Sequence, residues 1–478
     1  MNDTYFDNNE ISVSMFKLNE MKKMKKVLNV NQLNEELKNI GSSFEDFLIR
    51  EAPEEIFYLL SIIKNVVNDP RRQSGNLQHD MTPIIGIFFI SILSGYDIVK
   101  SIHNFGKDLW PVIISILDID EEYPSYDTFR RVLNATETSE IIEVRRIWQD
   151  KIGINYNIDN GENSEEISDI YINNWIEKAK EDLDALIAGE YEPPVRVCAQ
   201  DGKLMRATRS AVNNEVAKDV ISIYDVKTNE VLAESIVPSK KNEITENPKV
   251  VEKLDESFKY LISYDAMGCQ KDLAEEIHYR EWFYLFKVKN NQPILRRTIE
   301  QIFNEHNEKP LLTRSSTEGG HYTEWSFYVS DQTKGIEKEW AGAKSVAMVI
   351  TYSERDGKIT EEESYYVMNF LDPALFIYAK IMHWKIENQL HHPLDCVFNE
   401  DKCRVRTGNG HLNLNVMRKN AISFYRSVLR NIMEKTISLR SLTEILRKSI
   451  FSLNKCIKNV KLNIKFSIDD LLDEVVNI

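Results

Sequence analysis

The chain has 478 residues, of which 42% are hydrophobic and 10% aromatic, so it can bury ordinary cores and is not disordered throughout. Its net charge of −15 argues against nucleic-acid binding over the whole surface, because DNA phosphates must be neutralised by Lys and Arg. The charge is uneven, however: residues 402–458 hold thirteen Lys and Arg against two Asp and Glu, which leaves room for a local DNA-binding region.

The first part of the chain is predicted to be helical. Residues 1–55 are polar and charged, without the character of a signal peptide, and we expect an N-terminal extension. Residues 56–150 alternate apolar helical segments with brief polar turns, which predicts a small helical domain. The longest apolar run, residues 83–96, is too short to span a bilayer and is predicted to be a buried helix. Residues 151–193 are acidic and should form a connector that contains one helix.

From residue 195 the pattern changes to strands. RVCAQDGK, KDVISIYDV and VLAESIV are predicted to be strands, followed by a helix, the strand KYLISYDAMG, a second helix and the strand EWFYLFKVK. This order predicts an α/β fold with one mixed five-stranded sheet and flanking helices, in which the first and fourth strands lie side by side and run parallel.

Residues 292–370 interrupt this order with one helix and several strand-like runs, and we interpret them as a β-rich insertion. A helix at 373–392 follows, which Pro393 should end or kink. A further helix is expected at about 410–432, and residues 431–478 should form a basic helical tail.

Three acidic residues are candidates for one site. Asp201 and Asp265 end the first and fourth predicted strands, where open α/β sheets place their sites. Neighbouring carboxylates repel each other unless a cation lies between them, and such ligands suit Mg²⁺ or Mn²⁺. Glu387, on the helix at 373–392, would complete a two-metal site. Taken singly, the three residues also fit a turn residue, a helix N-cap and a solvated helix position.

Longer blocks around these residues carry a family resemblance. DGK at 201–203, SYDAMGCQ at 263–270, KNNQP at 289–293 and HWKIENQLHHPLDCVFNEDKCRVRTGN at 383–409 together resemble the DDE transposases of bacterial insertion sequences, in the branch of the H-repeat-associated proteins. NDPRR at 68–72 and PSYDTFRRVL at 124–133 resemble the N-terminal domain associated with that branch.

The resemblance implies an RNase H-like catalytic domain over residues 194–430, with Asp201, Asp265 and Glu387 as its catalytic and metal-binding triad. It further implies a bacterial cytoplasmic, nucleoid-associated transposase that cuts and joins double-stranded DNA with two Mg²⁺ or Mn²⁺ ions, as a homodimer on DNA and without a membrane. One departure is Ile381, which stands where the family usually carries an arginine six residues before the glutamate.

Two alternatives remain open at this point. The first is a transposase-derived DNA-binding protein with little or no catalysis, which the acidic balance and the missing arginine motivate. The second is a simple metal-dependent nuclease, which would hydrolyse DNA without joining strands.

Other residues are predicted to support the triad. The residues expected to contact DNA are Lys203, Lys289, Asn291, Gln292, Arg404 and Arg406, although surface or turn roles are alternatives for them. His383 and Asn388 flank Glu387 and are expected to orient it. Near the same block, Asp395, Glu400 and Asp401 are expected to pair with the two arginines, and Trp384 and Phe398 to lie in the core.

A zinc site is the competing interpretation of the histidines. His383, Glu387 and His391 are spaced i, i+4 and i+8, which places them on one helical face. The spacing is not HExxH, however, and the five cysteines form no CxxC pair, which disfavours both zinc and a disulfide framework and fits a reducing cytosol.

Overall fold

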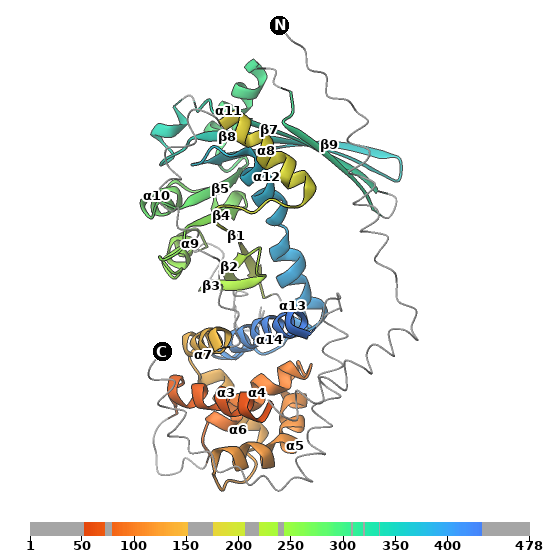
Figure 1. Cartoon of the computed structure of the whole chain (residues 1–478). Helices are drawn as coiled ribbons and strands as arrows, with labels where there is room; N and C mark the ends of the chain where they lie inside the picture. The colour runs from red at the N-terminus through yellow and green to blue at the C-terminus, as the bar shows by residue number, and fades with distance from the viewer. Residues whose placement is uncertain are drawn as a thin grey trace.

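The structure is a computed structural model that describes residues 52–71, 79–151, 175–205, 219–237, 243–306, 309–318, 321–333 and 335–432. The predicted extension (1–55) and basic tail (431–478) therefore lie almost entirely outside the described residues. Figure 1 shows a group of N-terminal helices next to a large sheet, with helix α14 between them. Within the described ranges, no helix is both long and apolar enough to cross a membrane.

The N-terminal helices share one apolar core, as the sequence predicts for residues 56–150. They are α3 (Ala52–Val66), α4 (Thr82–Leu93), α5 (Val99–Leu117), α6 (Tyr126–Ala135) and α7 (Thr138–Lys151). Helix α4 is buried along its whole length, which explains why it carries the longest apolar run of the chain. Helix α8 (Trp175–Ala188), from the predicted acidic connector, packs against α12 (Pro373–Met382).

The sheet has nine strands in the order β3-β2-β1-β4-β5-β9-β8-β7-β6. The first five are β1 (Arg196–Leu204), β2 (Asp219–Asp225), β3 (Glu230–Val237), β4 (Tyr260–Tyr264) and β5 (Phe283–Val288). Strand β1 pairs antiparallel with β2 and parallel with β4, so the predicted neighbours and directions are confirmed.

The predicted insertion continues this same sheet. Its strands are β6 (Leu312–Glu318), β7 (His321–Ser330), β8 (Ser345–Arg355) and β9 (Lys358–Met368). Strand β9 pairs antiparallel with the edge of β5, with Leu285 opposite Met368. The five predicted strands therefore form only part of a larger sheet, because an antiparallel partner covers the edge that β5 would otherwise expose.

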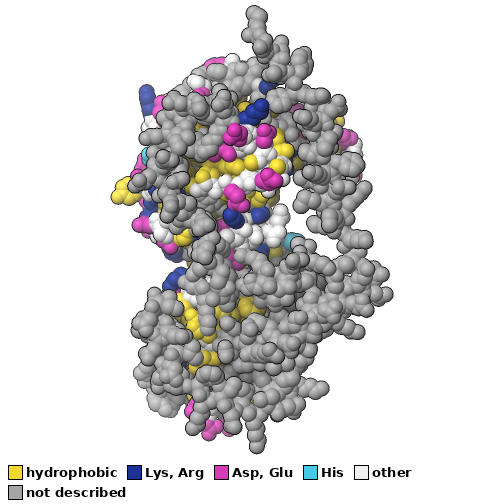
Figure 2. Space-filling model, viewed as in Figure 1, with side chains coloured by type: hydrophobic (Ala, Val, Ile, Leu, Met, Phe, Trp, Pro, Cys, Tyr) yellow, Lys and Arg dark blue, Asp and Glu magenta, His cyan; other side chains and the backbone are white. Residues whose placement is uncertain are grey.

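Helices cover the two faces of the sheet differently. Helices α9 (Glu243–Val251), α10 (Lys271–Tyr279) and α11 (Pro293–His306) share a core with Tyr264 and Phe286. The alternate positions Leu261 and Leu285 belong to the core that α12 covers. Because strand side chains alternate, this second face also receives Asp201 and Lys287. Figure 2 shows acidic, basic and hydrophobic side chains intermixed over the visible sheet region, rather than one acidic surface.

The helix predicted for 373–392, which Pro393 was expected to end or kink, is irregular and continues past that proline. Helix α12 ends at Met382, a π-helical turn spans Glu387–His391, and α13 (His392–Cys396) holds Pro393 in its first turn. A proline lacks the N–H that would bond the carbonyl of Gln389, four residues earlier. Arg426 of α14 (Gly410–Ile432) supplies that donor through Nη2. The widened turn and the arginine together let the chain continue past the proline.

His383 anchors the end of α12 to the sheet. Its Nδ1 lies 2.8 Å from Oγ of Ser263 in β4, and that hydroxyl donates to the carbonyl of Cys198 in β1 at 3.0 Å. Burial lowers the pKa of His383 to about 4, the positive charge of Lys287 adds to this effect, and Asp265 opposes it. His383 is therefore neutral at neutral pH.

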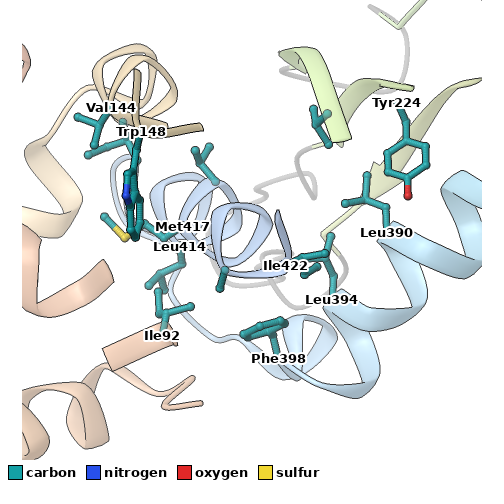
Figure 3. Close-up of a cluster of buried hydrophobic side chains, with 14 of the residues drawn as sticks. Ile92, Val144, Trp148, Tyr224, Leu390, Leu394, Phe398, Leu414, Met417 and Ile422 are labelled. Atoms are coloured by element: carbon teal, nitrogen blue, oxygen red, sulfur yellow. The ribbon is translucent and has the colours of Figure 1, made fainter. Parts of the chain in front are cut away.

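Helix α14 joins the N-terminal helices to the sheet. Figure 3 shows Trp148 of α7 beside Met417 of α14. It also shows Leu394 of α13 near Ile422, which is likewise on α14. Among these apolar contacts, Glu234 of β3 is buried and forms ion pairs with two cations. Nη2 of Arg145 in α7 lies 2.8 Å from Oε1 of Glu234, and Nζ of Lys419 in α14 lies 2.6 Å from Oε2. Burial opposes ionisation, but Arg145 and Lys419 together hold the pKa of Glu234 below its usual value.

Replacing Glu234 with Ala should destabilise the protein strongly. The substitution leaves Arg145 and Lys419 buried without a counter-charge, and such a loss costs about 3–5 kcal/mol. Chemical unfolding followed by circular dichroism measures it. Glu339→Ala is the control, because Glu339 pairs with Lys271 on the surface and its loss should cost under about 1 kcal/mol. Equal losses in the two variants would contradict the buried cluster.

The His383 anchor should make stability fall with acidity. Its pKa in the folded protein is about 4, below the usual histidine pKa of 6.5, so the unfolded chain binds more protons between these values. Stability should therefore decrease as pH falls from 6.5 towards 4. Between pH 7 and pH 5, His383→Gln, which does not titrate, should lose on the order of 2 kcal/mol less than the wild type. If unfolding experiments show that the wild type and His383→Gln lose the same stability between pH 7 and pH 5, a neutral His383 is contradicted.

Candidate metal centre

Two aspartates lie at the carboxyl ends of neighbouring parallel strands. Gln200 of β1 is in register with Tyr264 of β4, so Asp201 and Asp265 follow adjacent positions. Asp201 is partly buried, and its Oδ1 accepts the backbone N–H of Gly202 at 2.9 Å. Asp265 is exposed, and its Oδ1 accepts the N–H of Met267 at 2.8 Å, which caps a short 3₁₀ turn. Asp265 thus makes the N-cap contact that was the alternative interpretation of this residue, and it lies at the same edge of the sheet as Asp201.

The helical segment after α12 brings Glu387 and His391 to Asp201. Nδ1 of His391 lies 3.0 Å from Oε2 of Glu387 and 3.6 Å from Oδ2 of Asp201. One ligand atom from each of the three residues lies within 4.8 Å of the others. Asp265 is outside this group of three, but its charge acts on Asp201. The structure therefore brings together Asp201, Glu387 and His391, with Asp265 beside them.

The electrostatics of the group favour a cation. Burial raises the pKa of Asp201, and the charges of Asp265 and Glu387 raise it further, while His391 and the Gly202 N–H oppose the rise. The pKa of Glu387 is lowered, mainly by its hydrogen bond with His391. A divalent cation among these carboxylates would relieve the repulsion that Asp201 experiences.

The donor set fits a hard divalent ion. Carboxylate oxygens are the ligands of Mg²⁺ and Mn²⁺, and an imidazole nitrogen is compatible with several transition ions. Nε2 of His391 is buried and lacks a hydrogen-bond partner in the described structure. From sequence, His391 is a candidate ligand only in the zinc alternative. Its i+4 spacing from Glu387 was the available signal, and His383, the other histidine of that alternative, bonds to Ser263 instead.

The other predicted site residues divide into two groups. Lys203 pairs with Asp395 at 2.6 Å, and Asn291 and Gln292 donate their side-chain N–H groups to the carbonyls of Ala266 and Cys269. These three side chains hold the loops around the centre. The remaining candidates are exposed, and they are Lys289, Asn388, Arg404 and Arg406.

Three expectations for the segment around Glu387 are wrong. Asp395 pairs with Lys203 rather than an arginine of the block. Glu400 is buried and accepts from Asn415 of α14 at 2.9 Å, because it faces the helix rather than solvent. Trp384 is 62% exposed, since the turn after α12 directs it away from the core. Phe398, by contrast, is buried as predicted.

Comparison with known proteins assigns both parts of the chain. Residues 64–149 match the family described as DDE_Tnp_1-associated, and residues 194–424 match the family described as Transposase DDE domain. These matches fall within the ranges 56–150 and 194–430 of the sequence analysis.

Curated relatives come from bacteria. "Putative transposase YncI" of Escherichia coli O157:H7 is 28% identical over 366 residues, which cover 74% of this chain and 84% of that protein. "H repeat-associated putative transposase YhhI" of Escherichia coli K12 is 25% identical over 395 residues, which cover 76% of this chain and 91% of that protein.

Among solved structures, the piggyBac transposase in a synaptic complex with hairpin DNA aligns with a TM-score of 0.36 and 11% identity, over 91% of this chain and 84% of that chain, a likeness too weak to carry an argument. The two family matches and the order β3-β2-β1-β4-β5 agree with the predicted RNase H-like class. The chain belongs to the DDE transposase family and is a relative of the H-repeat-associated putative transposases.

Proposed function

We propose that this transposase catalyses metal-dependent cleavage of double-stranded DNA at the ends of an insertion sequence and joins those ends to target DNA. The observation that carries the proposal is the meeting of Asp201, Glu387 and His391 at the edge where Asp265 also ends its strand. Carboxylates from three separated parts of the sequence have no structural need to meet, since their repulsion opposes folding.

Asp201, Asp265 and Glu387 would hold two Mg²⁺ or Mn²⁺ ions. When bound, such ions lower the pKa of the attacking hydroxyl and stabilise the leaving oxygen. The hydrogen bonds of Gly202 and His391 keep Asp201 and Glu387 in place while the substrate binds. In strand joining, a DNA 3′-hydroxyl forms the new P–O bond as the target's 3′-oxygen leaves with the electron pair. One phosphodiester replaces another, so no ATP is needed.

The proposed partner is therefore DNA, both the element ends and the target. Two ends must be held in one assembly for joining, so we propose a homodimer on DNA. The bacterial relatives make the cytoplasm and its nucleoid the proposed location.

Substitution of the acidic residues should abolish strand cleavage. Asp201→Asn, Asp265→Ala and Glu387→Gln should each lower the cleavage rate by roughly 10³-fold or more, because each removes a negative ligand of the metal centre. The measurement is cleavage and joining of DNA that carries the element's own ends, in Mn²⁺. Asp356→Asn is the control, because Asp356 is exposed on a hairpin and its backbone has a positive φ of 50° that Asn tolerates.

The same assay separates the alternatives. A transposase-derived DNA-binding protein without catalysis predicts that the wild type and Asp265→Ala behave alike. A simple nuclease predicts cleavage without joined products. Either result would overturn the proposed strand transfer.

A further inference from the structure

Two half-buried lysines lie on the sheet face that α12 covers, which is the face that also receives Asp201. Lys287 is on β5, the strand beside β4, and alternates with Leu285, which belongs to the core under α12. Lys380 is on α12 itself. Its Nζ lies 5.7 Å from the ring centre of Trp325 and 5.4 Å from that of Phe327, both on β7. The lysines thus approach one region from the sheet and from the helix.

The charges of the two lysines affect each other and the candidate site. Burial lowers the pKa of Lys380 to about 8, and the charge of Lys287 contributes to this change. Burial and the charge of Lys289 lower the pKa of Lys287, whereas Glu362 and Asp265 oppose the shift. Lys287 also contributes to the lowered pKa of His383. These effects place Lys287 within electrostatic range of Lys380, His383 and Asp265.

Neither lysine has a carboxylate partner in an ion pair within the part of the chain that the structure describes. Two other shielded lysines do, since Lys203 pairs with Asp395 and Lys419 pairs with Glu234. Half-buried Lys385 instead donates to the backbone carbonyl of Val226. Glu362 and Asp265 act on Lys287 only from beyond ion-pair distance. A half-buried ammonium without a contacting carboxylate costs free energy, and two that repel each other cost more. The aromatic rings of β7 offset only part of this cost for Lys380. An anion from outside the chain would therefore offset the free-energy cost of these two charges.

We propose that Lys287 and Lys380 form a subsite for the DNA backbone, which binds phosphates within a nucleotide or two of the phosphate that reacts at the metal centre. This inference rests on the proposed function and deepens it. Adjacent strands lie roughly 4.8 Å apart, and successive phosphates of one DNA strand rise roughly 3.4 Å along the helix axis. A DNA strand that reacts beside Asp265, the residue after β4, and runs towards the neighbouring β5 would reach Lys287.

The salt dependence of DNA binding tests the subsite. The probe is a fluorescein-labelled duplex of about 30 base pairs in EDTA, followed by anisotropy between 50 and 200 mM salt. Each lost phosphate contact reduces the slope of log affinity against log salt by about 1. In the variant Lys287→Met with Lys380→Met, the salt-induced loss of affinity should be roughly tenfold smaller than in the wild type. Methionine keeps most of the aliphatic packing.

Lys271→Met is the matched control, because Lys271 lies on α10, on the opposite face, and pairs with Glu339. It should keep the wild-type slope or change it only slightly. Equal slopes for the wild type and the double variant would overturn the subsite. If the double variant does not fold, each single variant serves, with an expected slope change of about 1.

Thermal unfolding adds a second readout. If the lysines serve anion binding, each Lys→Met change should leave the melting temperature unchanged or raise it, because an uncompensated charge is removed. A clear fall in both variants, with unchanged slopes, would assign the lysines a structural role. Binding in EDTA needs no catalysis, so Asp201→Asn should keep the wild-type slope. If the wild type shows no cleavage but its salt slope still falls in the Lys→Met variants, the proposed reaction is contradicted and the subsite is not.

Discussion

Repulsion among the carboxylates of Asp201, Asp265 and Glu387 is the constraint on which the rest of the structure depends. Two strand ends and one helical turn bring them to one edge of the sheet, and the pKa of Asp201 rises as a result of burial and of its neighbours' charges. The Gly202 N–H and the His391 imidazole oppose that rise. A site that concentrates negative charge in this way favours a bound cation.

The position of Glu387 depends on elements far from the metal centre. His383 fixes the end of α12 to β4, and Arg426 supports the widened turn that precedes Pro393. Helix α14, which carries Arg426, is in turn held to the N-terminal helices through the cluster of Arg145, Glu234 and Lys419. The N-terminal helices therefore support the sheet domain through a buried ionic contact as well as through apolar packing.

The parts of the fold with local signals could be predicted from sequence. Alternating strands around a hairpin turn, followed by helical crossovers, were enough for the order of β1 to β5 and for the common edge of Asp201 and Asp265. The pairing of β9 with β5 could not be predicted, because it depends on a contact between residues as distant as Leu285 and Met368. The partners predicted for Asp395 and Glu400 were wrong for the same reason. The observed partners, Lys203 and Asn415, lie on other elements.

Binding of Mn²⁺ tests the central claim most directly, and electron paramagnetic resonance of the free ion measures it without any DNA. The account predicts saturable binding by the wild-type protein and by Asp356→Asn. It predicts that Asp201→Asn and Glu387→Gln weaken this binding severely, because each removes a charged ligand from the group within 4.8 Å. Wild-type affinity in both acidic-site variants, or no saturable binding in the wild type, would contradict a metal centre at this edge of the sheet.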